Sequence, residues 1–201
     1  MSLIRLILVF IFAVSMANCS KKASAPSASL PPKGKAIAPF ELTNQDGQPA
    51  TLGTYAGNVW VANFVFTTCP SICPEVTKAV AELQKTLDEK ELKAKLVTLT
   101  VDPEVDTPEI LRDYGLKYGA KFERWSFLTA SSVDVMRAVV EGNFKTAMGE
   151  KKAIKAGMYD IAHTTKLVLV DQDGHHRGYY SMDSSGRQHL VKAIQALTDS
   201  E

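Results

Sequence analysis

The hydrophobic positions of this chain fall into blocks of two kinds, and the two kinds alternate. Mostly apolar runs predict strands at residues 59–66, 96–101, 125–129 and 166–170. Apolar residues at helical spacing predict helices at about residues 75–90, 107–117, 131–140 and 185–197. This alternation predicts an α/β fold in which helices flank a central mixed sheet.

Polar turns with glycine add three further features. Asp46-Gly47 predicts a small N-terminal hairpin within residues 40–52, and Asp173-Gly174 predicts that residues 178–180 pair back on the preceding strand. Residues 143–158 are polar and glycine-punctuated, which predicts an exposed hairpin or loop inserted in the fold. Its lysines suit a solvated surface or a partner-docking face: Lys145, Lys151, Lys152 and Lys155.

The first 18 residues have the pattern of an export signal. One positive charge at Arg5 precedes an uncharged apolar core that is too short for a comfortable membrane span. Met-Ala-Asn-Cys-Ser around Cys19 resembles a bacterial lipobox, although Asn18 stands where a small residue is usual. We expect a lipoprotein-type signal peptide at 1–18; cleavage nearby without lipid and an uncleaved anchor helix are the alternatives.

Residues 19–36 have almost no apolar content and predict a flexible tether. Fully stretched, its 17 residues after Cys19 would reach on the order of 55 Å. We therefore expect a membrane-anchored domain at residues 37–199, in the bacterial periplasm or on the outer face of the inner membrane. Disulfides can persist in such a compartment.

Charge and size narrow the possible partners. The chain has 201 residues, enough for one domain with a sizeable core. It has 23 Lys and Arg against 22 Asp and Glu, and with Arg5 removed in the leader the two totals are equal. No basic stripe is present, so nucleic acid is excluded as a partner. We expect the domain to be monomeric.

The most distinctive stretch is residues 60–74. There a predicted buried strand is followed by Cys69 and Cys73, and each cysteine is followed by proline. Pro74 suits the first position of the following helix and favours extended geometry at the residue before it. We expect Cys73 near the helix cap, where the partial positive charge of the helix end favours thiolate over thiol. Thiolates are the reactive and metal-binding form of cysteine.

Four histidines could complete a metal site. His175 and His176 follow a turn and are most simply exposed, and His189 is most simply a surface or half-buried helix residue. His163 precedes the strand at 166–170, and taken alone it is also most simply structural.

Read together, these features resemble the Sco/SenC family. The resemblance is carried by Cys-Pro-x-x-Cys-Pro after a buried strand, by Val-Asp-Pro-Glu-x-Asp-Thr-Pro-Glu at 101–109, and by the histidine before a strand. It implies a thioredoxin-like, membrane-tethered copper protein in which Cys69, Cys73 and His163 bind the metal. It also implies a partner, a cytochrome c oxidase subunit whose dicopper centre receives copper or has its thiols reduced.

One position departs from the family pattern. Aspartate usually precedes the histidine, but Ala162 stands there and the nearest acid is Asp160. In an extended segment Asp160 and Ala162 face the same side, so Asp160 could take over a nearby role.

Three chemistries remain open for the cysteine pair. Two thiolates and an imidazole suit Cu(I), and Cu(II) with a further oxygen ligand, but zinc accepts the same set. A metal-free thiol–disulfide oxidoreductase would use Cys69 and Cys73 as a redox pair. However, thioredoxins space their cysteines one residue closer and use a cis-proline, and no proline follows Pro108. Peroxidase-like activity needs one activated cysteine and gives no reason for the paired prolines.

Overall fold

The computed structural model describes residues 30–155 and 157–199. The predicted signal peptide at 1–18, Cys19 and the first part of the predicted tether lie outside the described residues. The end of the tether contacts the domain, because Ala36 forms a β-bridge with His175. Within the described ranges, no helix is long and apolar enough to cross a membrane.

A seven-stranded mixed sheet forms the centre of the domain, in the order β2-β1-β5-β4-β3-β8-β9. Its strands are β1 (Glu41–Asn44), β2 (Pro49–Thr51), β3 (Val59–Val65), β4 (Ala94–Thr100), β5 (Trp125–Thr129), β8 (Leu167–Val170) and β9 (His176–Tyr180). β3, β4 and β5 are parallel neighbours, whereas β8 is antiparallel to β3. The predicted central mixed sheet is therefore confirmed.

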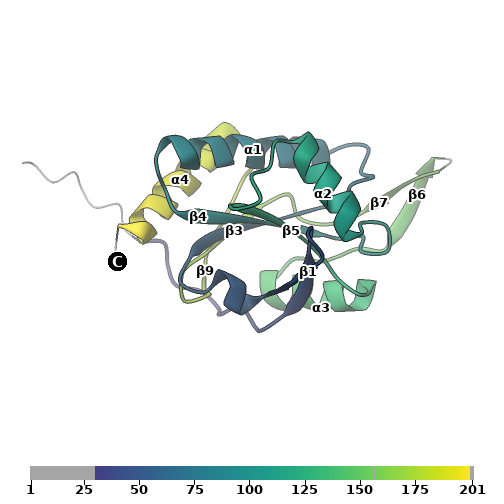
Figure 1. The fold of residues 1–201 in the computed structure, drawn as a ribbon, viewed down its shortest axis with the longest axis horizontal. Coiled ribbons are helices and arrows are strands. Elements are labelled where there is room, and N and C mark those ends of the chain that lie inside the picture. The colour runs from purple at the N-terminus through teal and green to yellow at the C-terminus, as the bar shows by residue number, and fades with distance from the viewer. Residues whose placement is uncertain (1–29, 156, 200–201) are drawn as a thin grey trace, which may run out of the picture.

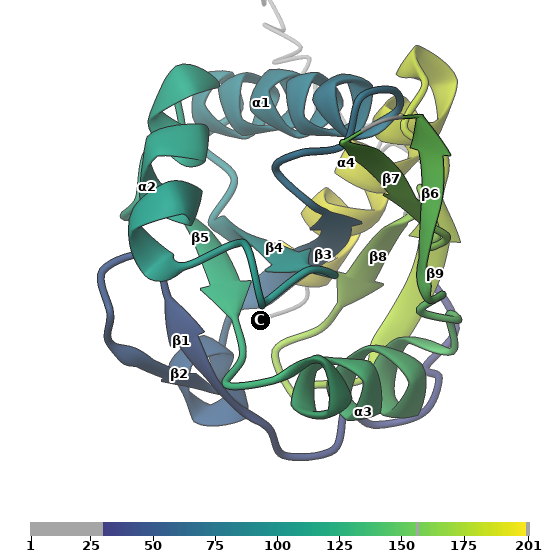
Figure 2. The same ribbon diagram turned by 90° about the vertical axis from the view of Figure 1, so that its right-hand side faces the viewer.

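The described residues form four α-helices and one 3-10 helix: α1 (Cys73–Glu89), α2 (Pro108–Lys117), α3 (Val133–Phe144), α4 (Ser184–Thr198) and η1 (Leu52–Tyr55). Figure 1 shows α1, α2 and α4 above the sheet and α3 below it. In Figure 2 the helices α1 and α3 again lie on opposite sides. The side chains of Thr107, Ser132 and Asp183 accept hydrogen bonds from the first turns of α2, α3 and α4.

The start of α1 differs from the prediction. Ile72 is the N-cap with helical backbone angles, and Cys73 is the first helical residue rather than an extended residue before the helix. Pro74 then occupies the second position, where a missing amide proton also costs no intrahelical hydrogen bond. Cys73 is thus fixed by the helix itself.

The core lies on both faces of the sheet and explains the apolar runs. All seven residues of β3 are buried, as expected of a central strand with helices on either side. Phe144 of α3 packs edge-on against Trp60 and Phe64 of β3, with ring centroids 6.1 and 5.2 Å apart. Each buried aromatic side chain of this kind contributes roughly 1.5–3 kcal/mol.

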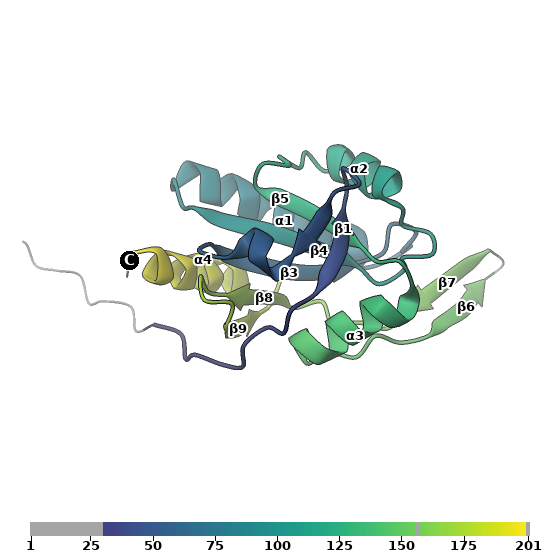
Figure 3. The same ribbon diagram turned by 60° about the horizontal axis from the view of Figure 1, so that its bottom comes forward.

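A separate two-stranded hairpin consists of β6 (Lys151–Lys155) and β7 (Met158–Ile161). Figure 3 shows it projecting beyond the end of the main sheet, and every residue of β6 is exposed. The exposed hairpin predicted within residues 143–158 is thus present, but it is shifted along the chain. Residues 143 and 144 complete α3, and the second strand continues to Ile161.

Candidate metal and thiol site

Strand order brings three distant segments to one edge of the sheet. β3 and β4 are parallel, so the loops that follow them leave at the same edge. β8 is antiparallel to β3, with Val168 opposite Ala62, so the segment that precedes β8 arrives at that edge too. The cysteine loop, the loop at 101–107 and His163 therefore meet there, where α/β folds commonly place functional sites.

The two cysteines share one turn of chain. The Cys69 amide donates to the carbonyl of Phe66 (3.2 Å), which folds the loop back, and the Cys73 amide donates to the sulfur of Cys69 (3.4 Å). Both side chains are buried, and both are free thiols in this structure. This arrangement brings the Cys69 sulfur to the first residue of α1, which is Cys73.

His163 completes the group. Its Nδ1 lies 2.6 Å from the carbonyl oxygen of Ile161, and because a carbonyl only accepts, Nδ1 carries the proton. The other ring nitrogen, Nε2, lies 3.8 Å from the sulfur of Cys73 and has its lone pair available. Phe66 packs against the imidazole with ring centroids 5.9 Å apart, in an edge-to-face arrangement. The structure thus places His163 beside Cys73, with the Cys69 sulfur against the Cys73 amide in the same loop.

The pKa values of the two thiols are shifted in opposite directions. Burial opposes ionisation of Cys69, but hydrogen bonds from the Cys73 thiol and from the amides of Ser71 and Cys73 outweigh it, so the pKa of Cys69 lies below its ordinary value. The deeper burial of Cys73, together with its contact with Cys69, raises the pKa of Cys73 well above the ordinary value. The expectation that the helix end favours a thiolate at Cys73 is thus wrong for the metal-free protein: desolvation dominates there.

The imidazole is held in its neutral form. Burial lowers the pKa of His163, although its hydrogen bond to Ile161 and the negative charge of Asp160 act in the opposite direction. A neutral imidazole with a fixed tautomer is the form that binds a metal ion. Two soft sulfurs and one such nitrogen fit Cu(I) or Cu(II), and zinc remains compatible with the same atoms.

The buried carboxylate of Asp106 fixes the start of the cysteine loop through hydrogen bonds. Asp106 is fully buried and accepts hydrogen bonds from the amide of Thr67 (3.1 Å), from the Thr67 hydroxyl (2.5 Å) and from the Thr100 hydroxyl (2.5 Å). Burial raises the pKa of Asp106 despite these hydrogen bonds. From the sequence, residues 101–109 were used only for the family resemblance. The signal for this supporting role was a pair of aspartates, Asp102 and Asp106, in the short loop between β4 and α2.

The position that departs from the family pattern lies on the outer face of its segment. Asp160 and Ala162 are both exposed, whereas Tyr159 and Ile161 point toward the domain, so Asp160 and Ala162 share a face as expected of an extended segment. The negative charge of Asp160 raises the pKa of both His163 and Cys73. Asp160 therefore acts on the site electrostatically.

The remaining histidines lie elsewhere. His189 is exposed on α4. His176 was expected to be exposed, but it is buried: its Nε2 lies 2.5 Å from the carbonyl oxygen of Asn143, and its ring stacks on Tyr179. The end of α3 provides this partner, which explains why a residue after a turn is buried.

His175 is half-buried and lies within reach of two carboxylates, those of Asp171 and Asp173. Both carboxylates are already engaged, since Arg177 lies 3.1 Å from Asp171 and Lys33 lies 3.0 Å from Asp173. This group therefore stabilises the turn before β9.

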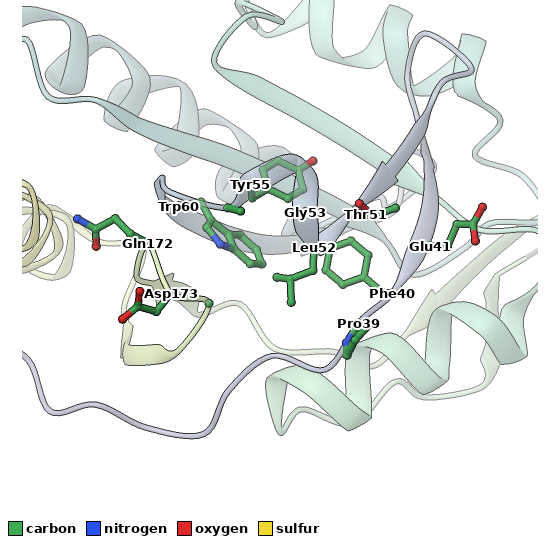
Figure 4. Close-up of a pocket in the computed structure, with 12 residues that line it drawn as sticks. Pro39, Phe40, Glu41, Thr51, Leu52, Gly53, Tyr55, Trp60, Gln172 and Asp173 are labelled. Carbon is green, nitrogen blue, oxygen red and sulfur yellow. The ribbon is translucent and has the colours of Figure 1, made fainter.

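A mostly apolar pocket of about 830 Å³ lies at the opposite end of β3 from the cysteines. Figure 4 shows Trp60, Phe40 and Leu52 around it, with Asp173 at its margin. None of the three candidate ligands lines this pocket, so it is separate from the metal and thiol site.

Comparisons with known proteins agree on one family. The family model described as SCO1/SenC matches residues 29–199. A protein of Stutzerimonas stutzeri that is named for copper binding is 30% identical over 158 residues, which cover 74% of this chain and 70% of that protein.

Solved structures show the same fold. A SCO1/SenC family lipoprotein from Bacillus anthracis is 30% identical, with a TM-score of 0.77 over 85% of this chain and 99% of its own. BsSco, described as a member of the Sco family of cytochrome c oxidase assembly proteins with a disulfide switch, is 27% identical, with a TM-score of 0.73 over 85% and 97%. The predicted thioredoxin-like fold, with its N-terminal hairpin and its inserted hairpin, is confirmed.

Proposed function

This chain belongs to the SCO1/SenC family, and from that premise we propose that it is a membrane-tethered copper-binding protein that delivers copper to the dicopper site of cytochrome c oxidase. A relative named for copper binding supports the choice of metal. The description of BsSco as a cytochrome c oxidase assembly protein supports the choice of partner.

One observation carries the proposal: the Nε2 atom of His163 lies 3.8 Å from the Cys73 sulfur, and the Cys73 amide contacts the Cys69 sulfur, so the three side chains lie at one edge of the sheet. Two thiolates hold Cu(I) in low coordination, and the imidazole adds the ligand that Cu(II) needs. Three protein ligands leave a position through which a partner's sulfur could reach the metal. Such a site suits a protein that hands its metal on.

Copper transfer tests the proposal directly. The reduced protein is loaded with one equivalent of Cu(I) and mixed with the purified, metal-free copper domain of an oxidase subunit. We expect copper to move to that domain, and we expect Cys69→Ala to transfer none. The exposed substitution His189→Ala serves as a control and should transfer as well as the unmodified protein. Copper that stays entirely on the donor, or that never binds it, would refute delivery.

A second candidate function is favoured by the difference in acidity between the two thiols. Cys69 has the lowered pKa and can attack as thiolate, whereas buried Cys73 remains protonated until it acts as the resolving thiol. Cys69 would attack a partner's disulfide, releasing one partner thiolate and forming a mixed disulfide. Cys73, losing its proton, would then attack Cys69, which oxidises the pair and releases the second partner thiol. The partner gains two electrons and one proton from the pair, and its remaining thiolate takes its proton from water.

This thiol reduction can coexist with copper delivery, because the same pair serves both. The described residues contain no cis peptide bond, so the cis-proline used by thioredoxins has no counterpart among them. Mixing the reduced protein with an oxidised copper domain tests the step. We expect two new thiols on the acceptor, and a trapped mixed disulfide with Cys73→Ser. An acceptor that stays oxidised would exclude this second function.

We also propose an extracytoplasmic location with lipid attached at Cys19. The leader pattern of residues 1–18 supports export, and the B. anthracis relative is described as a lipoprotein. Radiolabelled fatty acid incorporated by the full chain, and lost in Cys19→Ala, is the expected result.

A further inference from the structure

A buried ion pair links the exposed hairpin to the loop after β4. Asp102 is fully buried, and its Oδ1 lies 2.7 Å from the Nζ of Lys151 on β6. Its other oxygen, Oδ2, accepts a hydrogen bond from the Tyr159 hydroxyl on β7. Lys151 also lies 3.0 Å from Glu104, at the surface. One carboxylate therefore holds both strands of the hairpin.

The same network reaches the cysteine loop. The hydroxyl of Thr68, the residue before Cys69, donates to the Tyr159 hydroxyl at 2.8 Å. The Tyr159 ring stacks on Phe66, with centroids 5.8 Å apart and planes inclined by 16°, and the Lys151 ammonium lies 5.2 Å from the Tyr159 ring centroid. Phe66 in turn contacts the imidazole of His163. The hairpin, the cysteine loop and His163 thus share one set of contacts.

Other contacts fix the base of the hairpin: the Gly149 amide donates to the Ala162 carbonyl (2.8 Å), Arg137 pairs with Glu150 (2.6 Å), and Ile161 is buried in the core, but beyond this base the ion pair is the main link to the domain. The hairpin pairs with no strand of the main sheet, and all five residues of β6 are exposed (Figure 3). Lys151 differs from its neighbour: its side chain is 35% exposed and pairs with Asp102, whereas Lys152 forms no ion pair with any described residue. Burial lowers the pKa of Lys151, but its hydrogen bonds to Asp102 and Glu104 outweigh this and raise it, so the ion pair is maintained.

The hairpin leads directly to the candidate ligand. β7 ends at Ile161, whose carbonyl fixes Nδ1 of His163 two residues later. A displacement of β7 would therefore move the imidazole relative to Cys73. The position of His163 depends on what holds the hairpin in place.

We propose that Lys151, Asp102 and Tyr159 form a latch that positions His163 against the cysteine pair. The consequence for copper rests on the proposed function. With the latch closed, His163 stays beside the cysteines and Cu(II) is retained. With the latch open, only the two sulfurs remain, and they suit Cu(I). The three residues are positioning residues, because they act through His163. They also give the aspartate at 102 a role distinct from that of Asp106, which holds the cysteine loop.

The first test uses the metal-free, reduced protein and measures amide hydrogen exchange. We expect Lys151→Met to speed exchange at residues 158–163 by at least about tenfold, since it leaves the buried Asp102 carboxylate without its cationic partner. Exchange in β4 and α4 should stay as it was. Lys152→Met is the matched control and should change nothing. Unaltered exchange at 158–163 in Lys151→Met would overturn the latch, whether or not the protein binds copper.

A second variant covers the case in which Lys151→Met does not fold. Asp102→Asn combined with Lys151→Met leaves no unpaired buried charge, and in this double variant we expect the same faster exchange at 158–163. Tyr159→Phe keeps the ring stacked on Phe66 but removes the hydroxyl, and a smaller increase is expected. A double variant that folds with the hairpin exchanging as slowly as before would also overturn the proposal.

Copper binding provides the second readout. In Lys151→Met we expect Cu(II) affinity to fall by roughly tenfold or more, as for other partners that orient a ligand, together with a shifted thiolate-to-copper absorption band. Cu(I) affinity should change little, and Lys151→Arg should restore much of the Cu(II) signal. Equal losses for both ions would contradict a role through His163. If the unmodified protein binds no copper, the proposed function fails, while the exchange experiment still decides the latch.

Discussion

The sulfur of Cys73 lies 3.8 Å from the Nε2 atom of His163, although the two residues are 90 positions apart in the chain. No local pattern produces this contact. It arises because β8 runs antiparallel beside β3, so that the segment before β8 returns to the edge where β3 ends. The contact adds an imidazole nitrogen to the pair of thiols, which gives three candidate ligand atoms.

Loss of the imidazole should separate the two oxidation states of copper. We expect His163→Ala to weaken Cu(II) binding by about 100-fold or more, because the loss of even an outer partner of a ligand costs about 10–100-fold. Cu(I) binding should fall far less, since two thiolates hold that ion unaided. Competition titrations with a chelator for each ion measure both affinities. The control His189→Ala removes an exposed imidazole on α4; losses of equal size for both ions would contradict this division.

Alkylation should distinguish the two thiols. The pKa of Cys69 is lowered and that of Cys73 is raised, and Cys73 is fully buried. At pH 8 we therefore expect iodoacetamide to modify Cys69 several times faster than Cys73, because the thiolate is the nucleophile. Peptide mapping by mass spectrometry of the metal-free protein gives both rates. Faster modification of Cys73 would show that the assignment of the attacking thiol is reversed.

Asp106 should matter for stability as well as for the site. Asp106→Ala would leave the Thr67 amide and two hydroxyls without their acceptor, and we expect it to lower the free energy of unfolding by about 3 kcal/mol. Urea denaturation of the reduced protein measures this change. Asp113→Ala removes an exposed aspartate of α2 and should have little effect. A loss below about 1 kcal/mol in Asp106→Ala would indicate that the loop has other support.

The buried histidines should make the metal-free protein less stable in mild acid. Burial lowers the pKa of both His163 and His176 below 6.5, so below that pH the unfolded chain binds more protons than the folded chain. The contribution of these two histidines to the free energy of unfolding then falls as the pH drops below about 6.5. We expect His163→Gln to lose less stability between pH 7.5 and 5.5 than the unmodified protein. Denaturation curves at both pH values decide this, and an equal or larger loss in the variant would contradict it.

Most of the fold could be predicted from the sequence because its signals are local. Continuous apolar runs predicted β3, β4, β5 and β8, and apolar residues at helical spacing predicted α2 and α3 to within two residues of their starts. The start of α1 was misplaced by two residues, since Pro74 is compatible with either of the first two helical positions. The hairpin at 151–161 was expected too early in the chain, because a polar segment does not show which of its residues pair.

The candidate site, like the fold, was only partly predictable from the sequence. Cys69 and Cys73 could be singled out because they lie together after a buried strand, and His163 followed from the family resemblance. The buried state of His176 depends on a carbonyl at the end of α3, and the pairing of Lys151 with Asp102 depends on how the hairpin docks. Such contacts come from tertiary packing, which leaves no periodic signal in the sequence.

Titration of the reduced, metal-free protein with Cu(II), followed by visible absorption and electron paramagnetic resonance, tests the central claim most directly. We predict one copper ion per chain, an intense thiolate-to-copper charge-transfer band that disappears in Cys69→Ala and in Cys73→Ala, and nitrogen coupling that disappears in His163→Ala. Copper bound without the charge-transfer band, or a spectrum unchanged by these substitutions, would contradict a copper site built from Cys69, Cys73 and His163.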